Sequence, residues 1–390
     1  MKYIVFSTYF AILITIGLFF YHRSKTASSF VMGNRSLNYW VTALSAHASD
    51  MSAWLFMGFP AAVFVFGLGE LWTAASLVFF MFLAWQFVAP RLRTKTAQYG
   101  AMTLSSFFAA RFSKGHQKMV DRTHKKARTR LQISSALVCI FFLIAYIASG
   151  LVGLGRMFES LFEIDYRAGV LVGMLVIMSY TFLGGFLAVA WNDMLQAIFL
   201  LIMVILVPVL AMNALPSETT FMDLFEPKPA QGGLFSRALQ AFSWGLGYFG
   251  LPHVLNKYMS IDKVENIRKA KYVGLSWQTL ALFSAAMVGL LGAHILPNLA
   301  KPELIFVELT HTLFPPLMAQ VVLCAILAAA LSTLDSQVMV AASTLAEDVF
   351  KVPEEKELWL TRGAIVAICC AATGLAWSNT ASIYSLVFYA

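Results

Sequence analysis

Long runs of apolar residues, separated by short polar segments, extend along the whole chain. The first run covers residues 3–20, and about 18 apolar residues are enough for a helix to cross the hydrocarbon of a bilayer. No small-residue cleavage site follows it, so we interpret this run as a retained helix rather than a signal peptide. The runs predict ten membrane spans, at residues 3–20, 38–66, 70–92, 132–157, 168–186, 189–213, 236–252, 272–296, 316–345 and 361–378, and the start of an eleventh near Ile383.

The composition agrees with this pattern. Hydrophobic residues make up 59% of the chain and charged residues only 12%, whereas soluble globular proteins contain about 25% charged residues. We therefore predict an all-α polytopic membrane protein with a single transmembrane domain over residues 1–390. The sequence has no HExxH motif, no Walker glycine-lysine loop and no GxSxG motif in a usable context, so it gives no positive evidence for an enzyme.

The net charge of +8 raises the question of nucleic-acid binding, but the placement of the basic residues argues against it. Most of the 28 lysines and arginines lie in the loops after the first, third, seventh and ninth predicted spans. Cytoplasmic loops carry such an excess, so we expect these loops in the cytoplasm and the N-terminus on the periplasmic side of a bacterial inner membrane. The most basic stretch, residues 111–130, could also bind anionic lipid, although a topological anchor is the simpler interpretation.

Two predicted spans are interrupted by polar or glycine-rich segments, at residues 45–54 and 244–252. Irregular backbone at membrane depth is tolerated where it is buried in protein or lines a cavity, although glycine also serves simply for close helix packing. The breaks lie five helices apart. This spacing predicts an extra N-terminal helix and loop (1–36), a first five-helix repeat (37–213) and an inverted second repeat (235–390), the arrangement of secondary transporters with broken helices at the midplane.

Three aspartates, Asp50, Asp193 and Asp335, fall inside predicted spans. A carboxylate at the bilayer centre costs at least about 2.5 kcal/mol, so each needs a partner or an aqueous path and is a functional candidate. For Asp193, a position at the cytoplasmic interface is an open alternative.

The ninth span carries small and hydroxyl-bearing residues, Ala329, Ser332, Thr333 and Ser336, on one helical face. Hydroxyl oxygens are hard ligands suited to a hard cation, although serine and threonine also bond back to their own helix. A helix break at residues 48–51 would free backbone carbonyls to complete a cation shell begun by Ser332 and Thr333.

Aromatic residues flank the two breaks: Trp54, Tyr146, Trp244 and Tyr248. Each alone is more simply a packing residue. Together they would form apolar walls with polar tips around a small amphiphilic solute.

Four segments in order, SAHASDMSAW at 45–54, TFLGGFLAV at 181–189, WGLGYFG at 244–250 and ILAAALSTL at 326–334, resemble the sodium/solute symporters, most closely the bacterial sodium/proline symporters. The resemblance implies a LeuT-type inverted-repeat fold and alternating access that couples sodium to uptake of a small amino acid, proline first, without any cofactor.

Carried over by position, the resemblance implies three sets of site residues. The main sodium site would use the carbonyls of Ala48, Met51 and Ala329 and the hydroxyls of Ser332 and Thr333. Asp50 would serve sodium coupling, and Asp193 and Ser336 match a second cation site of some members. The solute pocket would use Ser52, Trp54, Tyr146, Trp244, Tyr248 and Pro252.

The chain departs from the family pattern at three positions. His47 replaces a small residue, Ala53 replaces a glycine, and Asp335 stands where serine is frequent. We hypothesise that Asp335 stabilises a second cation or lets a proton substitute for sodium. An Asp335→Ser variant with unchanged sodium and pH dependence would contradict this.

The chain stops at Ala390, inside the expected eleventh span, so the second repeat is expected to be truncated. A second chain supplying the missing helices is one expectation, and the chain alone is then expected to transport poorly. Three alternatives stay open: another solute such as pantothenate or a sugar, a sensor-type relative, and a nonfunctional remnant.

Overall fold

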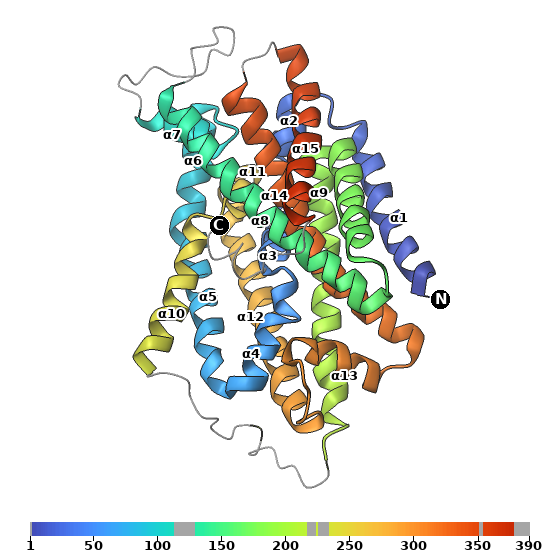
Figure 1. Ribbon diagram of the computed structural model, residues 1–390. Coiled ribbons are helices and arrows are strands. Elements are labelled where there is room, and N and C mark those ends of the chain that lie inside the picture. The colour runs from blue at the N-terminus through green and yellow to red at the C-terminus, as the bar shows by residue number, and fades with distance from the viewer. Residues whose placement is uncertain (1, 113–128, 217–223, 225–233, 351–353, 378–390) are drawn as a thin grey trace.

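The computed structural model describes residues 2–112, 129–216, 224, 234–350 and 354–377. Within these ranges the chain is helical and forms no named strand, which confirms the predicted all-α class. The helices are α1 (Lys2–Tyr21), α2 (Ala27–Met32), α3 (Tyr39–Met51), α4 (Gly58–Phe66), α5 (Leu71–Leu83), α6 (Ala89–Tyr99), α7 (Leu104–Phe112), α8 (Arg130–Phe162), α9 (Tyr166–Met212), α10 (Leu234–Leu246), α11 (Pro252–Ser260), α12 (Asn266–Ile295), α13 (Ile305–Leu313), α14 (Pro316–Thr344) and α15 (Glu354–Ala376). Figure 1 shows α1 and α10 at opposite edges of the molecule.

By length and composition alone, seven helical segments of the described chain are apolar enough to cross a membrane. The ten predicted spans correspond to α1, α3 with α4, α5 with α6, α8, the two parts of α9, α10 with α11, α12, α14 and α15. The two numbers differ because residues 53–99 count as one segment, α9 also counts once, and the short helices α10 and α11 do not count. The predicted eleventh span near Ile383 lies outside the described residues.

Large apolar side chains cover the outside of the bundle. Phe19, Phe141 and Phe283 are all more than 60% exposed, which would be unfavourable in water but suits a surface that faces lipid. In contrast, almost every residue of α14 from Val322 to Ala342 is buried. The helix α14 therefore forms the centre of the bundle, in contact with α3, α8 and α9.

The 47 residues of α9 form two helices that meet at Gly185. A straight helix of this length would measure about 70 Å, far more than the bilayer's hydrocarbon of about 30 Å. Gly185 has φ of 62° and ψ of −152°, a conformation that strongly favours glycine. Tyr180 and Asp193, on either side of it, both hydrogen-bond to neighbouring residues of α14, so the chain folds back at Gly185. The predicted division into spans 168–186 and 189–213 is confirmed.

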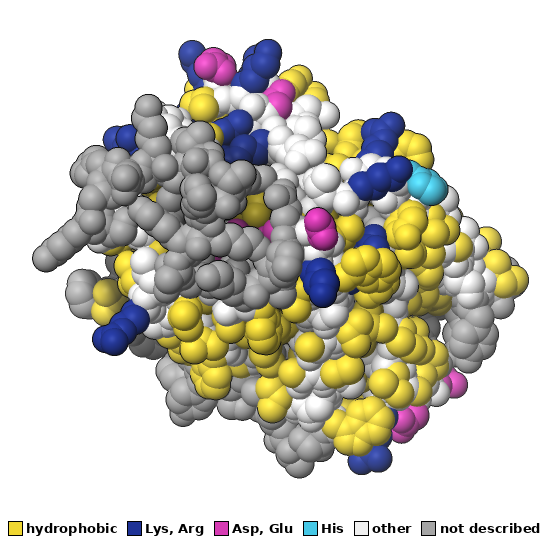
Figure 2. Space-filling view, turned by 90° about the horizontal axis from the view of Figure 1, so that it is seen from above, with side chains coloured by type: hydrophobic (Ala, Val, Ile, Leu, Met, Phe, Trp, Pro, Cys, Tyr) yellow, Lys and Arg dark blue, Asp and Glu magenta, His cyan; other side chains and the backbone are white. Residues whose placement is uncertain are grey.

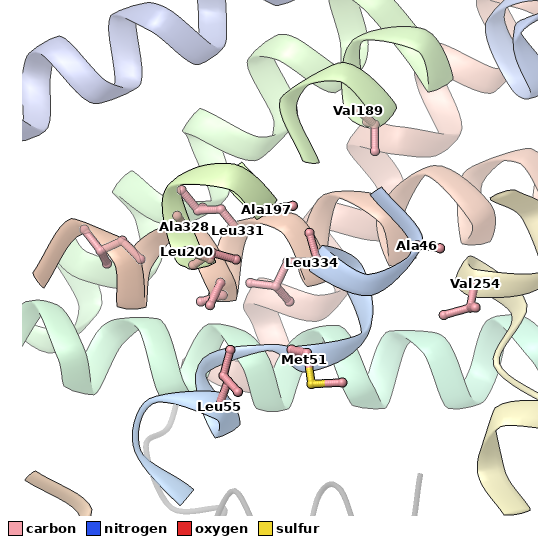
Figure 3. Close-up of a cluster of buried hydrophobic side chains, with 14 of the residues drawn as sticks. Ala46, Met51, Leu55, Val189, Ala197, Leu200, Val254, Ala328, Leu331 and Leu334 are labelled. Atoms are coloured by element: carbon pink, nitrogen blue, oxygen red, sulfur yellow. The ribbon is translucent and has the colours of Figure 1, made fainter. Parts of the chain in front are cut away.

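The first predicted break is present, a few residues later than its centre. The helix α3 ends at Met51, and Ser52 has φ of 48° and ψ of −170° before a short 3-10 turn, η2 (Ala53–Leu55). The Ser52 hydroxyl accepts a hydrogen bond from the Trp54 amide at 3.2 Å, so Ser52 caps this turn. In Figure 3 the ribbon bends between Met51 and Leu55.

The second break is also present, but the predicted boundary of its span is wrong. After α10 the chain forms a 3-10 turn, η6 (Gly247–Phe249), and α11 then continues from Pro252 to Ser260. Proline is favoured at the first helical position, where its missing N–H leaves no bond unmade, so Pro252 starts a helix instead of ending a span. Lys257 was expected in the cytoplasmic loop after the seventh span, whereas it lies inside α11 and is only 1% exposed.

Arginine side chains form hydrogen bonds between segments at the end of the molecule that contains α2, α6 and α7. The Arg35 guanidinium donates to the carbonyls of Thr96 and Ala101, and Arg93 donates to those of Ile261 and Asp262. Figure 2 looks onto this end and shows several Lys and Arg side chains there. Part of the basic stretch 111–130 lies outside the described residues.

Candidate cation and solute site

A hydroxyl of α14 connects directly to the end of α3. The Ser332 Oγ lies 3.0 Å from the Ala48 carbonyl oxygen and 3.1 Å from the Ala329 carbonyl oxygen, to which it can donate. The Thr333 hydroxyl donates to the same Ala329 carbonyl at 3.2 Å. Ala48, Ala329 and Ser332 are fully buried. The structure thus brings together four of the five residues expected around sodium. Two of them, Ala48 and Ser332, are 284 positions apart in the sequence.

The break supplies carbonyls because it ends a helix. The last four carbonyls of a helix have no partner inside it, and in α3 these belong to residues 48–51. The Ala48 carbonyl accepts the Ser332 hydroxyl, and α11 of the second broken helix packs against α3. Met51, the fifth expected ligand, is buried in the same final turn. The two broken helices therefore meet at their interruptions.

Asp50 bonds to the second break rather than to the hydroxyls of α14. The Tyr248 hydroxyl of η6 donates to Asp50 Oδ2 at 2.7 Å, and the Gln278 amide of α12 donates to the Tyr248 hydroxyl at 3.3 Å. These two hydrogen bonds join α3, η6 and α12 around the Asp50 carboxylate. Hydrogen bonds of this kind are how a charged group is accommodated away from water.

We expect a Tyr248→Phe variant to lose about 1.5–3 kcal/mol of stability, because a carboxylate would lose its donor while the ring packing stays. Thermal unfolding of the purified protein in detergent would measure this. The matched control is Tyr272→Phe, since the Tyr272 side chain is 56% exposed. Equal melting temperatures for the two variants would contradict the structural importance of the Asp50 contact.

A second cluster contains Asp193, Ser336 and Asp335 together with two residues not expected from the sequence, Lys257 and Tyr180. Lys257 Nζ of α11 lies 2.7 Å from Asp193 Oδ2, and the Ser336 hydroxyl donates to the same oxygen at 3.0 Å. The Tyr180 hydroxyl donates to Asp335 Oδ2 at 2.7 Å. Asp193 is completely buried within the protein. The signal that could have identified Lys257 is Pro252, which starts a helix and carries the lysine into the membrane.

The expected solute residues fall into separate groups. Tyr146 and Pro252 line a cavity of about 760 Å³ between α7, α8, α11 and α14. Trp54 and Trp244 pack edge to face, with ring centroids 5.3 Å apart, and Trp244 is 55% exposed. Tyr248 is engaged by Asp50, as described above. The cavity wall thus contains two of the six expected residues.

His47 packs against two tryptophans, Trp85 and Trp277. Trp85 Nε1 donates to His47 Nε2 at 3.2 Å, and the Trp277 ring centroid lies 6.1 Å from that of His47. The imidazole also lies directly against Gly274 of α12. This departure from the family pattern is a packing contact between α3, η4 (Ala84–Val88) and α12.

Comparison with known proteins agrees with this architecture. The profile of the "Sodium:solute symporter family" matches residues 30–390. Sodium/proline symporters of Staphylococcus aureus strains JH9 and USA300 are each 37% identical over 405 aligned positions, covering 99% of this chain and 77% of theirs.

Two solved structures show the fold. A sodium-coupled sialic acid symporter in a substrate-bound outward-open state superposes with a TM-score of 0.79 at 16% identity, covering 96% of this chain and 81% of its own. MHP1, a nucleobase-cation-symport-1 family transporter, gives 0.58 at 13% identity, covering 93% and 76%. The predicted LeuT-type fold with broken helices is confirmed. The chain belongs to the sodium:solute symporter family, a family of membrane transporters with sodium as the coupling ion.

Proposed function

We propose that this chain takes up proline together with sodium by alternating access across a bacterial inner membrane. The observation that carries the proposal is the bond between the Ser332 hydroxyl and the Ala48 carbonyl, because it places hard oxygen atoms of α14 against the free carbonyls of a broken helix. The 37% identity to sodium/proline symporters over almost the whole chain supports proline as the solute.

Sodium would bind to the carbonyl oxygens of Ala48, Met51 and Ala329 and the hydroxyl oxygens of Ser332 and Thr333. The hydroxyl protons that now point at Ala48 and Ala329 would turn away, so that every oxygen faces the ion. Because these ligands come from α3 and α14, ion binding would draw the two helices together. Asp50 would pass this change to the second break, through its bond to Tyr248.

The solute would bind between the two breaks. The N-terminus of α11 at Pro252 lines the cavity, and a helix N-terminus favours an anion such as the carboxylate of an amino acid. Tyr146 lines the same cavity, and its ring would supply an apolar wall for the pyrrolidine ring. Ser52 would act by fixing the turn that presents Trp54.

The orientation follows from the charge distribution. The end of the molecule with Arg35, Arg93 and the start of the basic stretch would face the cytoplasm, and the N-terminus would be periplasmic.

Uptake of labelled proline into proteoliposomes tests the proposal. We expect accumulation above equilibrium only when sodium is higher outside, and competition by unlabelled proline but not by pantothenate, a sugar or sialic acid. Potassium in place of sodium is the control for leakage. If one of the other solutes blocks sodium-driven uptake better than proline does, that solute replaces proline in the proposal. Sodium coupling would then still stand.

A further inference from the structure

A lysine side chain is bound where the family resemblance places a second cation. Asp193 and Ser336 are the expected ligands, and Lys257 Nζ lies 2.7 Å from Asp193 Oδ2, the oxygen that also accepts the Ser336 hydroxyl. Lys257 is 1% exposed, Asp193 0% and Ser336 2%. An ammonium is a compact monovalent cation on a flexible stem, so it meets the electrostatic demand of such a site.

The surroundings hold the ammonium in place. Lys257 extends from α11 across to α9, and its Nζ lies 5.0 Å from the centre of the Phe186 ring, within cation–π range. Asp335 is the neighbour of Ser336 on α14, and its Oδ2 accepts the Tyr180 hydroxyl of α9. The lysine therefore pairs with a carboxylate of α9 that is itself bonded to α14.

We propose that the Lys257 ammonium is a built-in cation that takes the place of a second sodium ion at Asp193 and Ser336. The chain would then bind a single sodium ion, at Ser332 and Thr333. The inference rests on the proposed sodium site but not on proline as the solute. It also gives Lys257 a structural role, because the ion pair fixes α11, the second half of a broken helix, to α9.

The free carboxyl oxygens indicate what would follow if the ammonium were removed. Asp193 Oδ1 and Asp335 Oδ1 are buried and have no hydrogen-bond partner among the described residues. Without Lys257 the pocket would hold two carboxyl groups and the Ser336 hydroxyl, a set of hard oxygens with excess negative charge. Such a set favours a hard cation, so sodium should enter the pocket.

Counting bound sodium tests the inference on the complete chain in nanodiscs, with radioactive sodium and no solute. We expect one sodium per chain for the wild type and for Lys257→Arg, which keeps a cation in the pocket. For Lys257→Met we expect two. The double variant Lys257→Met/Asp193→Asn should return to one, because its pocket has lost a carboxylate as well as the ammonium.

A wild-type count of two would overturn the inference, and so would a count of one for folded Lys257→Met. If Lys257→Met does not fold, the wild-type count still decides. Ser332→Ala, measured in parallel, assigns the wild-type ion to the main site if the count falls to zero, and overturns the inference if one ion remains. Failure of proline uptake would leave all of these counts unaffected, so the two proposals fail separately.

Discussion

Replacing Ser332 by alanine is expected to lower sodium-driven proline uptake about tenfold or more and to raise the sodium concentration needed for half-maximal uptake. The variant removes one ligand oxygen and leaves the buried Ala48 carbonyl without its partner. In the sodium-bound form the lost oxygen is a polar contact to a charged ion, which is worth about 1.5–3 kcal/mol, and about 1.4 kcal/mol corresponds to a factor of ten in affinity. Initial uptake rates over a series of sodium concentrations would measure both effects.

The control for Ser332→Ala is Thr310→Val in α13. Thr310 is completely buried, and its hydroxyl donates to the Phe306 carbonyl of its own helix. Its loss removes a buried hydroxyl without touching the link between α3 and α14. A wild-type sodium dependence in Ser332→Ala would contradict the proposed sodium site.

Replacing Gly185 by alanine is expected to prevent most of the protein molecules from folding correctly. At φ of 62° and ψ of −152° any side chain is strained, by about 1–3 kcal/mol. In addition, the new Cβ would lie 2.7 Å from the Phe30 carbonyl oxygen, so α2 would have to move. Fluorescence-detected size-exclusion chromatography after a heating series would report the yield of folded protein and its melting temperature.

Gly363→Ala in α15 is the matched control, because a Cβ at Gly363 meets no atom within 4 Å. In a helix this exchange is favourable by about 0.5–1 kcal/mol. If Gly185→Ala melted at the same temperature as Gly363→Ala, the fold-back of α9 at Gly185 would not need glycine.

The interruptions of the membrane helices could be predicted because they break a local pattern. Polar and glycine residues at membrane depth stand out against apolar flanks, and both breaks are found within the expected segments. The hydroxyl face of Ser332 and Thr333 was readable for the same reason, since positions three and four apart lie together on any helix. Helix periodicity alone is enough to place these residues on one face of α14.

The partners of the buried charges could not be read in this way. Lys257 and Asp193 are 64 positions apart, and Tyr180 and Asp335 are 155 apart. Only the packing of α9, α11 and α14 brings them together. A lysine just after the end of a predicted span looks the same in the sequence as a topological anchor. Because the seventh span was ended at residue 252, Lys257 was assigned to a loop and not to a buried helix.

The solute residues illustrate a different limit. The resemblance put Tyr146 and Pro252 in one group, and both residues line the same cavity. The resemblance did not reveal which way each aromatic ring turns, since ring direction depends on neighbours from other helices. Trp54 packs on Trp244, and Tyr248 on Asp50, through such contacts.

The hydroxyl of Ser332 has a consequence for the return half of a transport cycle. A carrier must reset its conformation after releasing its cargo, and an orphaned carbonyl in hydrocarbon would oppose that step. Because the Ser332 proton can bond the Ala48 carbonyl, the unloaded chain keeps that oxygen satisfied. In the loaded form both oxygens would face the ion, and in the empty form the Ser332 proton would lie between them. The empty carrier could therefore reset without leaving a buried carbonyl unpaired.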